Sequence, residues 1–210
     1  MNPETMARID AILHQAPVVP VLAVADADDA VPLAETLVAA GLPVLEITLR
    51  TPAALEVIRR MRSVPGAIVG AGTVLTAADL AAVRDAGAAF AISPGGTDAL
   101  YAAAKTADIP LLPGIATASE LMRGLEHGWT RFKFFPAEAS GGIAALKAFA
   151  GPFAQVKFCP TGGIDAAKAP GYLALPNVIT VGGSWMVPGE SLKARDWAAI
   201  GALTEAAARR

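Results

Sequence analysis

Lys133 is the residue best suited to covalent chemistry, and it lies inside the aromatic run Arg131–Pro136. A lysine is seldom buried without a partner, because taking its ammonium group out of water costs several kcal/mol. An amine in such surroundings is a candidate covalent nucleophile that burial helps to activate. The competing interpretation is a lysine at a strand edge with its amine in water.

A second group of candidates lies on the strand-like segment 44–50. Side chains alternate between the two faces of a strand, so Glu46, Thr48 and Arg50 share one face and apolar residues share the other. The apolar face must pack on helices, which directs the polar face into the interior of a barrel. We interpret Glu46 as a proton-transfer group and Arg50 as an anion anchor, because a buried ion pair adds little net stability. The alternative is an internal ion pair that only fills the core.

Two glycine pairs end the last two predicted strands, in Thr161-Gly162-Gly163 and in Gly182-Gly183-Ser184. Backbone N–H groups at glycine turns and helix N-termini bind phosphate, and barrels place such sites after their last two strands. The pattern predicts a small phosphorylated ligand, against the alternative of two ordinary turns. Weaker signals, with small residues that leave room for a ligand, lie at Gly70–Thr73 and Ser93–Gly96.

An inward lysine accompanied by Glu46 and Arg50 predicts imine chemistry on a keto acid. The amine attacks a carbonyl, and the protonated imine is then an electron sink for carbon–carbon cleavage or for loss of an α-proton. Glu46 would move protons, directly or through water. The sequence offers few ligands for a catalytic metal, because His14 and His127 lie away from the strand ends. A metal site made of carboxylates alone, from Glu46 and Glu138, stays possible, but no other feature of the sequence points to it. We therefore expect no metal and no cofactor.

The elements that must position these residues alternate regularly along the chain. Runs rich in Val, Ile, Leu and Phe predict buried strands, and alanine-rich segments predict helices. Eight such units without a linker predict one α/β domain over residues 1–210, a (β/α)8 (TIM) barrel with an extra N-terminal helix over Met1–Gln15. An open doubly wound sheet is the alternative, disfavoured because no Gly-x-Gly-x-x-Gly follows the first strand. The predicted strands are Val18–Val24, Val44–Leu49, Ala67–Gly72, Ala89–Ser93, Pro110–Pro113, Arg131–Pro136, Val156–Pro160 and Val178–Val181.

Helix boundaries are predicted from capping residues. Asp26 or Asp28 begins the first crossover helix, which ends near Gly41, and Thr117 or Ser119 caps the helix that runs to about His127. The remaining helices are expected from Thr51, over Thr76–Ala86, Thr97–Ala107 and Gly142–Phe149, from Asp165, and over Ser191–Ala208.

Composition limits the class of protein. The 210 residues are 54% hydrophobic and 17% charged, which favours a large core over disorder. A net charge of −2 without a basic cluster disfavours a nucleic-acid partner. With no bilayer-length apolar run and no signal peptide, we expect a soluble cytoplasmic protein without a membrane partner. The lone Cys159 excludes an intrachain disulfide and should behave as a small hydrophobic residue.

Six segments together resemble the 2-dehydro-3-deoxy-6-phosphogluconate (KDPG) aldolase family over nearly the whole chain. The resemblance implies a homotrimeric (β/α)8 class I aldolase of the Entner–Doudoroff route, which releases pyruvate and glyceraldehyde 3-phosphate. The segments are Val44–Thr51, Ile68–Leu75, Phe90–Gly95, Phe132–Glu138, Cys159–Ile164 and Gly182–Trp185.

The same resemblance implies roles for individual residues. Lys133 matches the Schiff-base lysine and Glu46 the acid/base glutamate, while Arg50 and Thr73 match groups around the pyruvyl carboxylate. The first strand lacks the basic residue that some relatives carry, so C4 stereochemistry and activity on 4-hydroxy-2-oxoglutarate stay open. Pro94 and Phe135 match pocket walls, Gly162, Gly163 and Ser184 match the phosphate site, and Thr161 and Gly183 beside them complete the substrate-binding set.

Two other classes of function stay open on the residues alone. One is a phosphosugar isomerase or epimerase in which Lys133 acts without a covalent bond. The other is a phosphosugar-binding barrel with no catalytic activity. Borohydride trapping with pyruvate separates the aldolase from both, because only a Schiff base is reduced to a permanent adduct.

Overall fold

A ring of eight parallel strands organises the structure. In the computed structural model, which describes residues 3–209, a six-stranded sheet has the order β5-β4-β3-β2-β1-β9 and a three-stranded sheet the order β6-β7-β8. Parallel bridges from Phe158 to Val178 and from Thr161 to Gly182 join β8 to the β9 segment and close the ring. The strands are β1 (Val18–Leu22), β2 (Val44–Thr48), β3 (Ile68–Gly72), β4 (Ala91–Ile92), β5 (Leu111–Leu112), β6 (Gly114–Ile115), β7 (Arg131–Phe134), β8 (Lys157–Pro160) and β9 (Val181–Gly183).

The fifth strand continues beyond its predicted end at Pro113, and that proline divides it into β5 and β6. Proline has no N–H to donate to a ladder, so it interrupts the pairing. β5 pairs with β4 through Leu111 and Leu112, whereas β6 pairs with β7 through Gly114 and Ile115. Counted as one, this strand gives the eight of a (β/α)8 barrel, and the predicted fold class is confirmed.

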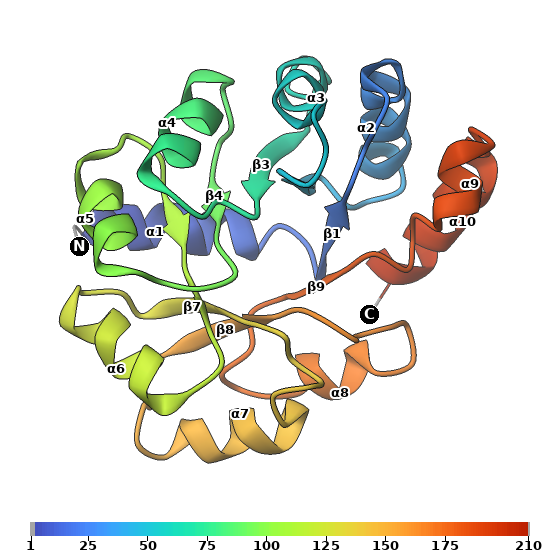
Figure 1. The fold of residues 1–210 in the computed structure, drawn as a ribbon. Coiled ribbons are helices and arrows are strands. Elements are labelled where there is room, and N and C mark those ends of the chain that lie inside the picture. The colour runs from blue at the N-terminus through green and yellow to red at the C-terminus, as the bar shows by residue number, and fades with distance from the viewer. Residues whose placement is uncertain (1–2, 210) are drawn as a thin grey trace.

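The helices cover the outside of the ring (Figure 1). They bury apolar side chains against the outward faces of the strands, and within residues 3–209 none is long and apolar enough to cross a bilayer. They are α1 (Pro3–Leu13), the 3-10 turn η1 (Ala27–Asp29), α2 (Ala30–Ala39), α3 (Ala54–Met61), α4 (Ala77–Asp85), α5 (Asp98–Thr106), α6 (Ala118–Glu126), α7 (Gly142–Ala150), α8 (Ala169–Leu173), α9 (Gly189–Lys193) and α10 (Trp197–Ala208).

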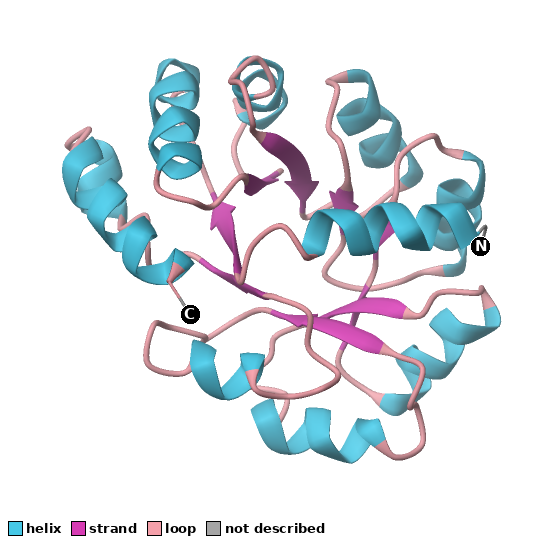
Figure 2. Ribbon diagram, turned by 180° about the vertical axis from the view of Figure 1, so that it is seen from behind, coloured by secondary structure: helices cyan, strands magenta, loops and turns pink. Residues whose placement is uncertain are grey.

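Helix α1 is the exception, because it crosses the strands at one end of the barrel (Figure 2). Its side chains Ile9 and Leu13 are buried in a cluster with Val19 of β1, Val44 at the start of β2 and Leu112 of β5. This apolar plug fills the barrel near the amino ends of the strands. The carboxyl ends, where barrels carry their chemistry, are left for polar side chains.

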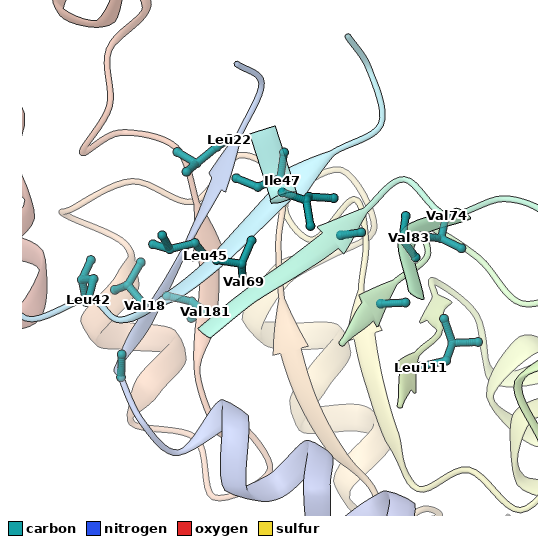
Figure 3. Close-up of a cluster of buried hydrophobic side chains, with 14 of the residues drawn as sticks. Val18, Leu22, Leu42, Leu45, Ile47, Val69, Val74, Val83, Leu111 and Val181 are labelled. Atoms are coloured by element: carbon teal, nitrogen blue, oxygen red, sulfur yellow. The ribbon is translucent and has the colours of Figure 1, made fainter. Parts of the chain in front are cut away.

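The outward faces of the strands form the second and larger core. Leu45 and Ile47 of β2 lie there with Val18, Leu22 and Val69 of the neighbouring strands (Figure 3). The expected alternation in β2 is therefore present, since its odd-numbered side chains face the helices. Glu46, between them, is buried in the interior with 1% of its surface exposed.

Side-chain caps fix where the crossover helices begin. Thr76 and Thr117 form capping boxes with Asp79 and Glu120, each hydroxyl accepting a backbone N–H three residues on. Thr117, rather than Ser119, is thus the cap of α6. After β1, the expected aspartate cap begins η1, where Asp26 accepts from the N–H of Asp28, and α2 follows only from Ala30.

The prediction of one helix over Ser191–Ala208 was wrong. Two helices, α9 and α10, occupy this region because Arg195 adopts a left-handed conformation between them (φ 53°). The Arg195 guanidinium donates to Asp29 at 2.6 Å, and Asp196 then accepts the N–H of Ala199 as the cap of α10. A long-range ion pair holds this break, and apolar spacing carries no signal of it.

The eighth strand was also misplaced, since it was predicted over Val178–Val181 and β9 is Val181–Gly183. Val178 contributes only an isolated bridge, and the hydroxyl of Thr180 donates to the Ala16 carbonyl at 2.9 Å. The apolar pattern puts the strand too early because glycines are rare inside strands. Residues Met1 and Asn2 of the predicted first helix lie outside the described residues.

Candidate active site

A buried ion pair lies at the centre of the candidate site. The Lys133 ammonium of β7 donates to Oε1 of Glu46 on β2 at 3.0 Å, across the inside of the barrel. Their side chains are only 7% and 2% exposed. A pair so deeply buried gives little net stability, so its presence in the interior points to chemistry.

The Glu46 carboxylate is accommodated because glycine occupies the adjacent strand. A Cβ at Gly72 of β3 would lie 2.1 Å from Oε1 of Glu46. Any larger residue would force the Glu46 carboxylate out of its present position. Gly72 therefore supports the pair by leaving space for the Glu46 side chain, whereas sequence pattern predicts only that the small residues 70–73 leave room for a ligand.

Two neighbours shape the surroundings of the Lys133 amine. The ammonium lies 5.2 Å from the centre of the Phe135 ring, within the range of a cation–π contact. Cys159 pairs with Lys133 in the ladder between β7 and β8, and burial raises the pKa of its thiol to about 12. This neutral thiol acts as an apolar neighbour, and no metal-binding group of three or more His, Cys, Asp or Glu side chains lies within residues 3–209.

Arg50 is held by a short chain of hydrogen bonds at the end of β2. Its Nε donates to Oγ1 of Thr48 at 3.0 Å, and that hydroxyl donates to the carbonyl of Leu22 on β1 at 2.8 Å. Thr48 is buried, while Arg50 is exposed at the mouth of the barrel. Thr48 is a positioning residue absent from the predicted set, although the alternation that selected Glu46 and Arg50 also selects it.

Thr73, directly after β3, has a left-handed backbone (φ 61°). A β-branched residue rarely adopts this conformation, which costs about 1–3 kcal/mol and is commonly found at ligand-binding sites. The strain turns the chain at the carboxyl end of the strand and places the Thr73 hydroxyl near the rim. No sequence pattern indicates such strain, because the residue type argues against it.

Pro94 is fixed on the loop after β4 by close packing. A Cβ at Gly114 of β6 would lie 2.3 Å from the Pro94 carbonyl oxygen, so the two backbones can approach only because residue 114 is glycine. The buried Ser93 hydroxyl accepts the N–H of Gly95 at 3.4 Å. Pro94 is thereby held as part of the rim.

The predicted phosphate residues come together at the ends of β8 and β9. Gly162 and Gly163 have positive φ angles of 105° and 77°, and Thr161 bridges to Gly182 beside Gly183. Among the described residues, no acceptor receives the backbone N–H of Gly163 or of Ser184. The buried hydroxyl of Thr161 likewise has no hydrogen-bond partner in that part of the chain. These groups can hold an anion.

The chain matches known proteins over most of its length. A family model described as KDPG and KHG aldolase matches residues 9–203. A protein of Escherichia coli named KHG/KDPG aldolase is 55% identical over 199 residues, which are 94% of this chain and 93% of that protein. A protein of Zymomonas mobilis named 2-dehydro-3-deoxy-phosphogluconate aldolase is 55% identical over 183 residues, 87% of this chain and 88% of that one.

Solved structures of aldolases match the chain with similar sequence identity and coverage. The KDPG aldolase of Legionella pneumophila, with pyruvate captured at low pH as a covalent carbinolamine intermediate, is 50% identical, with a TM-score of 0.93 over 95% of this chain and 98% of that one. The 2-keto-3-deoxy-6-phosphogluconate aldolase of Zymomonas mobilis with 3-phosphoglycerate is 53% identical, with a TM-score of 0.92 over 95% and 94%.

Proposed function

The chain belongs to the KDPG and KHG aldolase family, and we propose that it cleaves KDPG to pyruvate and glyceraldehyde 3-phosphate through a Schiff base on Lys133. It is a carbon–carbon lyase by membership of that family. The observation that carries the proposal is the buried contact of 3.0 Å between the Lys133 amine and Glu46. A nucleophile beside a proton acceptor is what imine formation requires.

Imine formation begins with the transfer of the Lys133 proton to Glu46. The neutral amine attacks C2 of the keto acid, the carbonyl oxygen takes up the proton that Glu46 holds, and the nitrogen returns one of its protons to Glu46, which gives a carbinolamine. A second proton, delivered by Glu46 or by water in its contact, lets that oxygen leave as water. The product is a protonated imine, whose nitrogen carries the positive charge.

Carbon–carbon cleavage follows from that charge. Glu46, directly or through water, removes the proton of the C4 hydroxyl. The electrons of the C3–C4 bond then move toward the imine nitrogen, and glyceraldehyde 3-phosphate leaves with C4 as its aldehyde carbon. The remaining enamine takes a proton at C3 from Glu46, and water then hydrolyses the imine to release pyruvate and the amine. The iminium is the electron sink throughout, so this reaction needs no cofactor.

The rim residues fit the two ends of this substrate. We assign Arg50 and Thr73 to the carboxylate of the pyruvyl half, because a guanidinium held by Thr48 presents a fixed donor to an anion. Pro94 and Phe135 wall the reacting carbons. The phosphate at the far end is assigned to Thr161, Gly162, Gly163, Gly183 and Ser184, which are supported by the free N–H groups and hydroxyl described above.

A second substrate, 4-hydroxy-2-oxoglutarate, is favoured by a specific observation. The similar Escherichia coli protein is named KHG/KDPG aldolase. β1 carries no basic residue, so nothing on that strand selects for or against the distal carboxylate of this compound. Cleavage rates of KDPG, of its C4 epimer and of 4-hydroxy-2-oxoglutarate, measured side by side, rank the three.

Borohydride trapping tests the covalent step. Incubation with pyruvate and borohydride should add a permanent pyruvate-derived mass to the peptide that contains Lys133. Lys133→Met should abolish the adduct, while the matched change Lys157→Met, at the opposite end of the neighbouring strand β8, should leave it. No adduct at any pH, together with unchanged KDPG turnover in Lys133→Met, would refute the Schiff base.

The assembly and location follow as further parts of the proposal. We propose one domain over residues 1–210 and a homotrimer, supported by the family resemblance. A trimer of 21.3 kDa chains has a mass of about 64 kDa, which light scattering distinguishes from a monomer. A cytoplasmic location is supported by the single buried cysteine, which forms no disulfide.

A further inference from the structure

The loop Gly162–Gly163 is held from behind by three side chains outside the proposed substrate contacts. We propose that Lys168, Glu138 and Tyr172 form a positioning network that fixes this loop and so strengthens binding of the phosphate end of KDPG. This inference rests on the proposed function, since it deepens the role of the phosphate end.

Lys168 is the direct link to the loop. Its ammonium donates to the Gly163 carbonyl at 2.8 Å and lies 3.1 Å from Oε2 of Glu138. Asp165 holds the start of this segment, because its Oδ1 accepts the backbone N–H groups of Ala167 and Lys168 at 3.0 Å each. Its carbonyl and carboxylate partners give this half-exposed lysine a defined position beside the loop.

Glu138 connects the loop to the strand of the nucleophile. It follows β7 by four residues, and its backbone N–H donates to the Gly162 carbonyl at 3.1 Å. Its stem packs against the loop, since a Cβ at Gly163 would lie 2.8 Å from both Cβ and Cγ of Glu138. One residue therefore holds the loop through both its backbone and its side chain.

Tyr172 anchors the network in the core. It is fully buried on α8, and its hydroxyl donates a short hydrogen bond to Oε1 of Glu138. That bond, followed by the Lys168 ammonium, lowers the pKa of Glu138, so the carboxylate stays charged. Glu138 in turn raises the pKa of Lys168. The network thus keeps its charges and its geometry across the neutral range.

The consequence for the loop follows from peptide geometry. In a trans peptide the C=O and the following N–H point in opposite directions. Glu138 holds the Gly162 carbonyl and Lys168 holds the Gly163 carbonyl, so the N–H groups of Gly163 and Ile164 both point away from the network. Two neighbouring N–H groups fixed in this way form a concavity for one anion.

The test compares a reaction that uses the phosphate with one that does not. For Lys168→Met, the KM for KDPG should rise about tenfold, because the loop that holds the phosphate loses a charge-assisted hydrogen bond, while kcat changes less. Deuterium exchange at the methyl group of pyruvate, which needs no phosphate, should keep its rate. Tyr172→Phe should show the same split, and Lys168→Arg should recover part of the KM.

Lys147→Met is the matched control, because Lys147 is an exposed lysine on the neighbouring helix α7. Equal KM values for the Lys147 and Lys168 variants, or equal losses in cleavage and exchange, would overturn the inference. So would a KM increase that disappears at 0.5 M salt, since it would reflect only net charge. Failure of the unaltered chain to cleave KDPG would instead refute the proposed function.

Discussion

Replacing Glu46 with glutamine separates proton transfer from binding. The amide has the shape of the carboxylate, and its oxygen can still accept the hydrogen bond that the Lys133 ammonium makes at 3.0 Å. It cannot accept a proton. The substitution therefore removes the acid/base function while filling the same space beside Gly72, where no larger group fits.

The Glu46→Gln substitution should slow proton transfer far more than it weakens the binding of pyruvate. General acid/base catalysis contributes about 10²–10⁴-fold, equal to about 2.7–5.4 kcal/mol in the barrier. Pyruvate binding should change by less than about threefold, or 0.7 kcal/mol, because we assign the pyruvate carboxylate to Arg50 and Thr73 and not to Glu46. The hydroxyl of Thr48, which holds Arg50, lies two residues further along β2, about 6.6 Å at 3.3 Å per residue.

Deuterium exchange at the pyruvate methyl group is the assay, because it reports proton transfer without carbon–carbon cleavage. NMR follows the exchange, and inhibition by pyruvate measures its binding. Glu126→Gln, the same change at an exposed position on α6, serves as the control and should leave both values unchanged. Equal losses of exchange rate and pyruvate affinity in Glu46→Gln would refute the assignment, since they would mean that Glu46 only builds the pocket.

Three further changes test the supporting structure. Thr48→Val should raise the KM for pyruvate about tenfold and lower the free energy of unfolding by about 1–2 kcal/mol, because it frees the Arg50 guanidinium and removes the buried hydrogen bond to the Leu22 carbonyl; steady-state kinetics and urea unfolding measure both. Gly72→Ala should lower kcat about a hundredfold, because its Cβ displaces the Glu46 carboxylate, and a crystal structure should show that shift. The pKa of Glu138 is lowered, chiefly by the Tyr172 hydroxyl, so this carboxylate stabilises the fold above its unfolded value of 4.5 and the contribution is lost as the pH falls through the folded value. Urea unfolding should accordingly show a stability difference between the unaltered chain and Glu138→Gln that is present at pH 7 and shrinks toward pH 3.

The alternation of apolar and polar residues predicts correctly which side chains of a strand face the interior of the barrel, because adjacent residues in the sequence determine that facing. In β2 the alternation of Leu45, Ile47 and Leu49 with polar residues is enough to direct Glu46 inward. In β7 the same rule separates Lys133 from Phe132 and Phe134, both of which are buried in the helix-facing core. Both strands carry one face that must meet helices, so register and facing are strongly specified.

What local pattern misses depends on contacts between distant segments. The left-handed Arg195 is held by Asp29, 166 residues earlier, and no window of sequence contains both. Thr73 is strained in a conformation that its residue type disfavours, so propensity predicts the opposite of what occurs. The network of Glu138, Lys168 and Tyr172 joins two strand ends and a helix, and only the folded chain brings its members together.

The division of the barrel into an apolar and a polar half explains how Lys133 and Glu46 can remain buried. Breaking such a pair costs about 3–5 kcal/mol, whereas forming it yields little, so the pair cannot hold the fold together. The stabilising burial lies instead in the helix-facing core and in the plug that Ile9 and Leu13 build at the amino ends of the strands. Because α1 covers that end, we expect water and substrate to reach the pair from the carboxyl ends, where Arg50 and the glycine loops lie. The free energy that stabilises the fold thus comes from these two apolar clusters and not from the buried pair of Lys133 and Glu46.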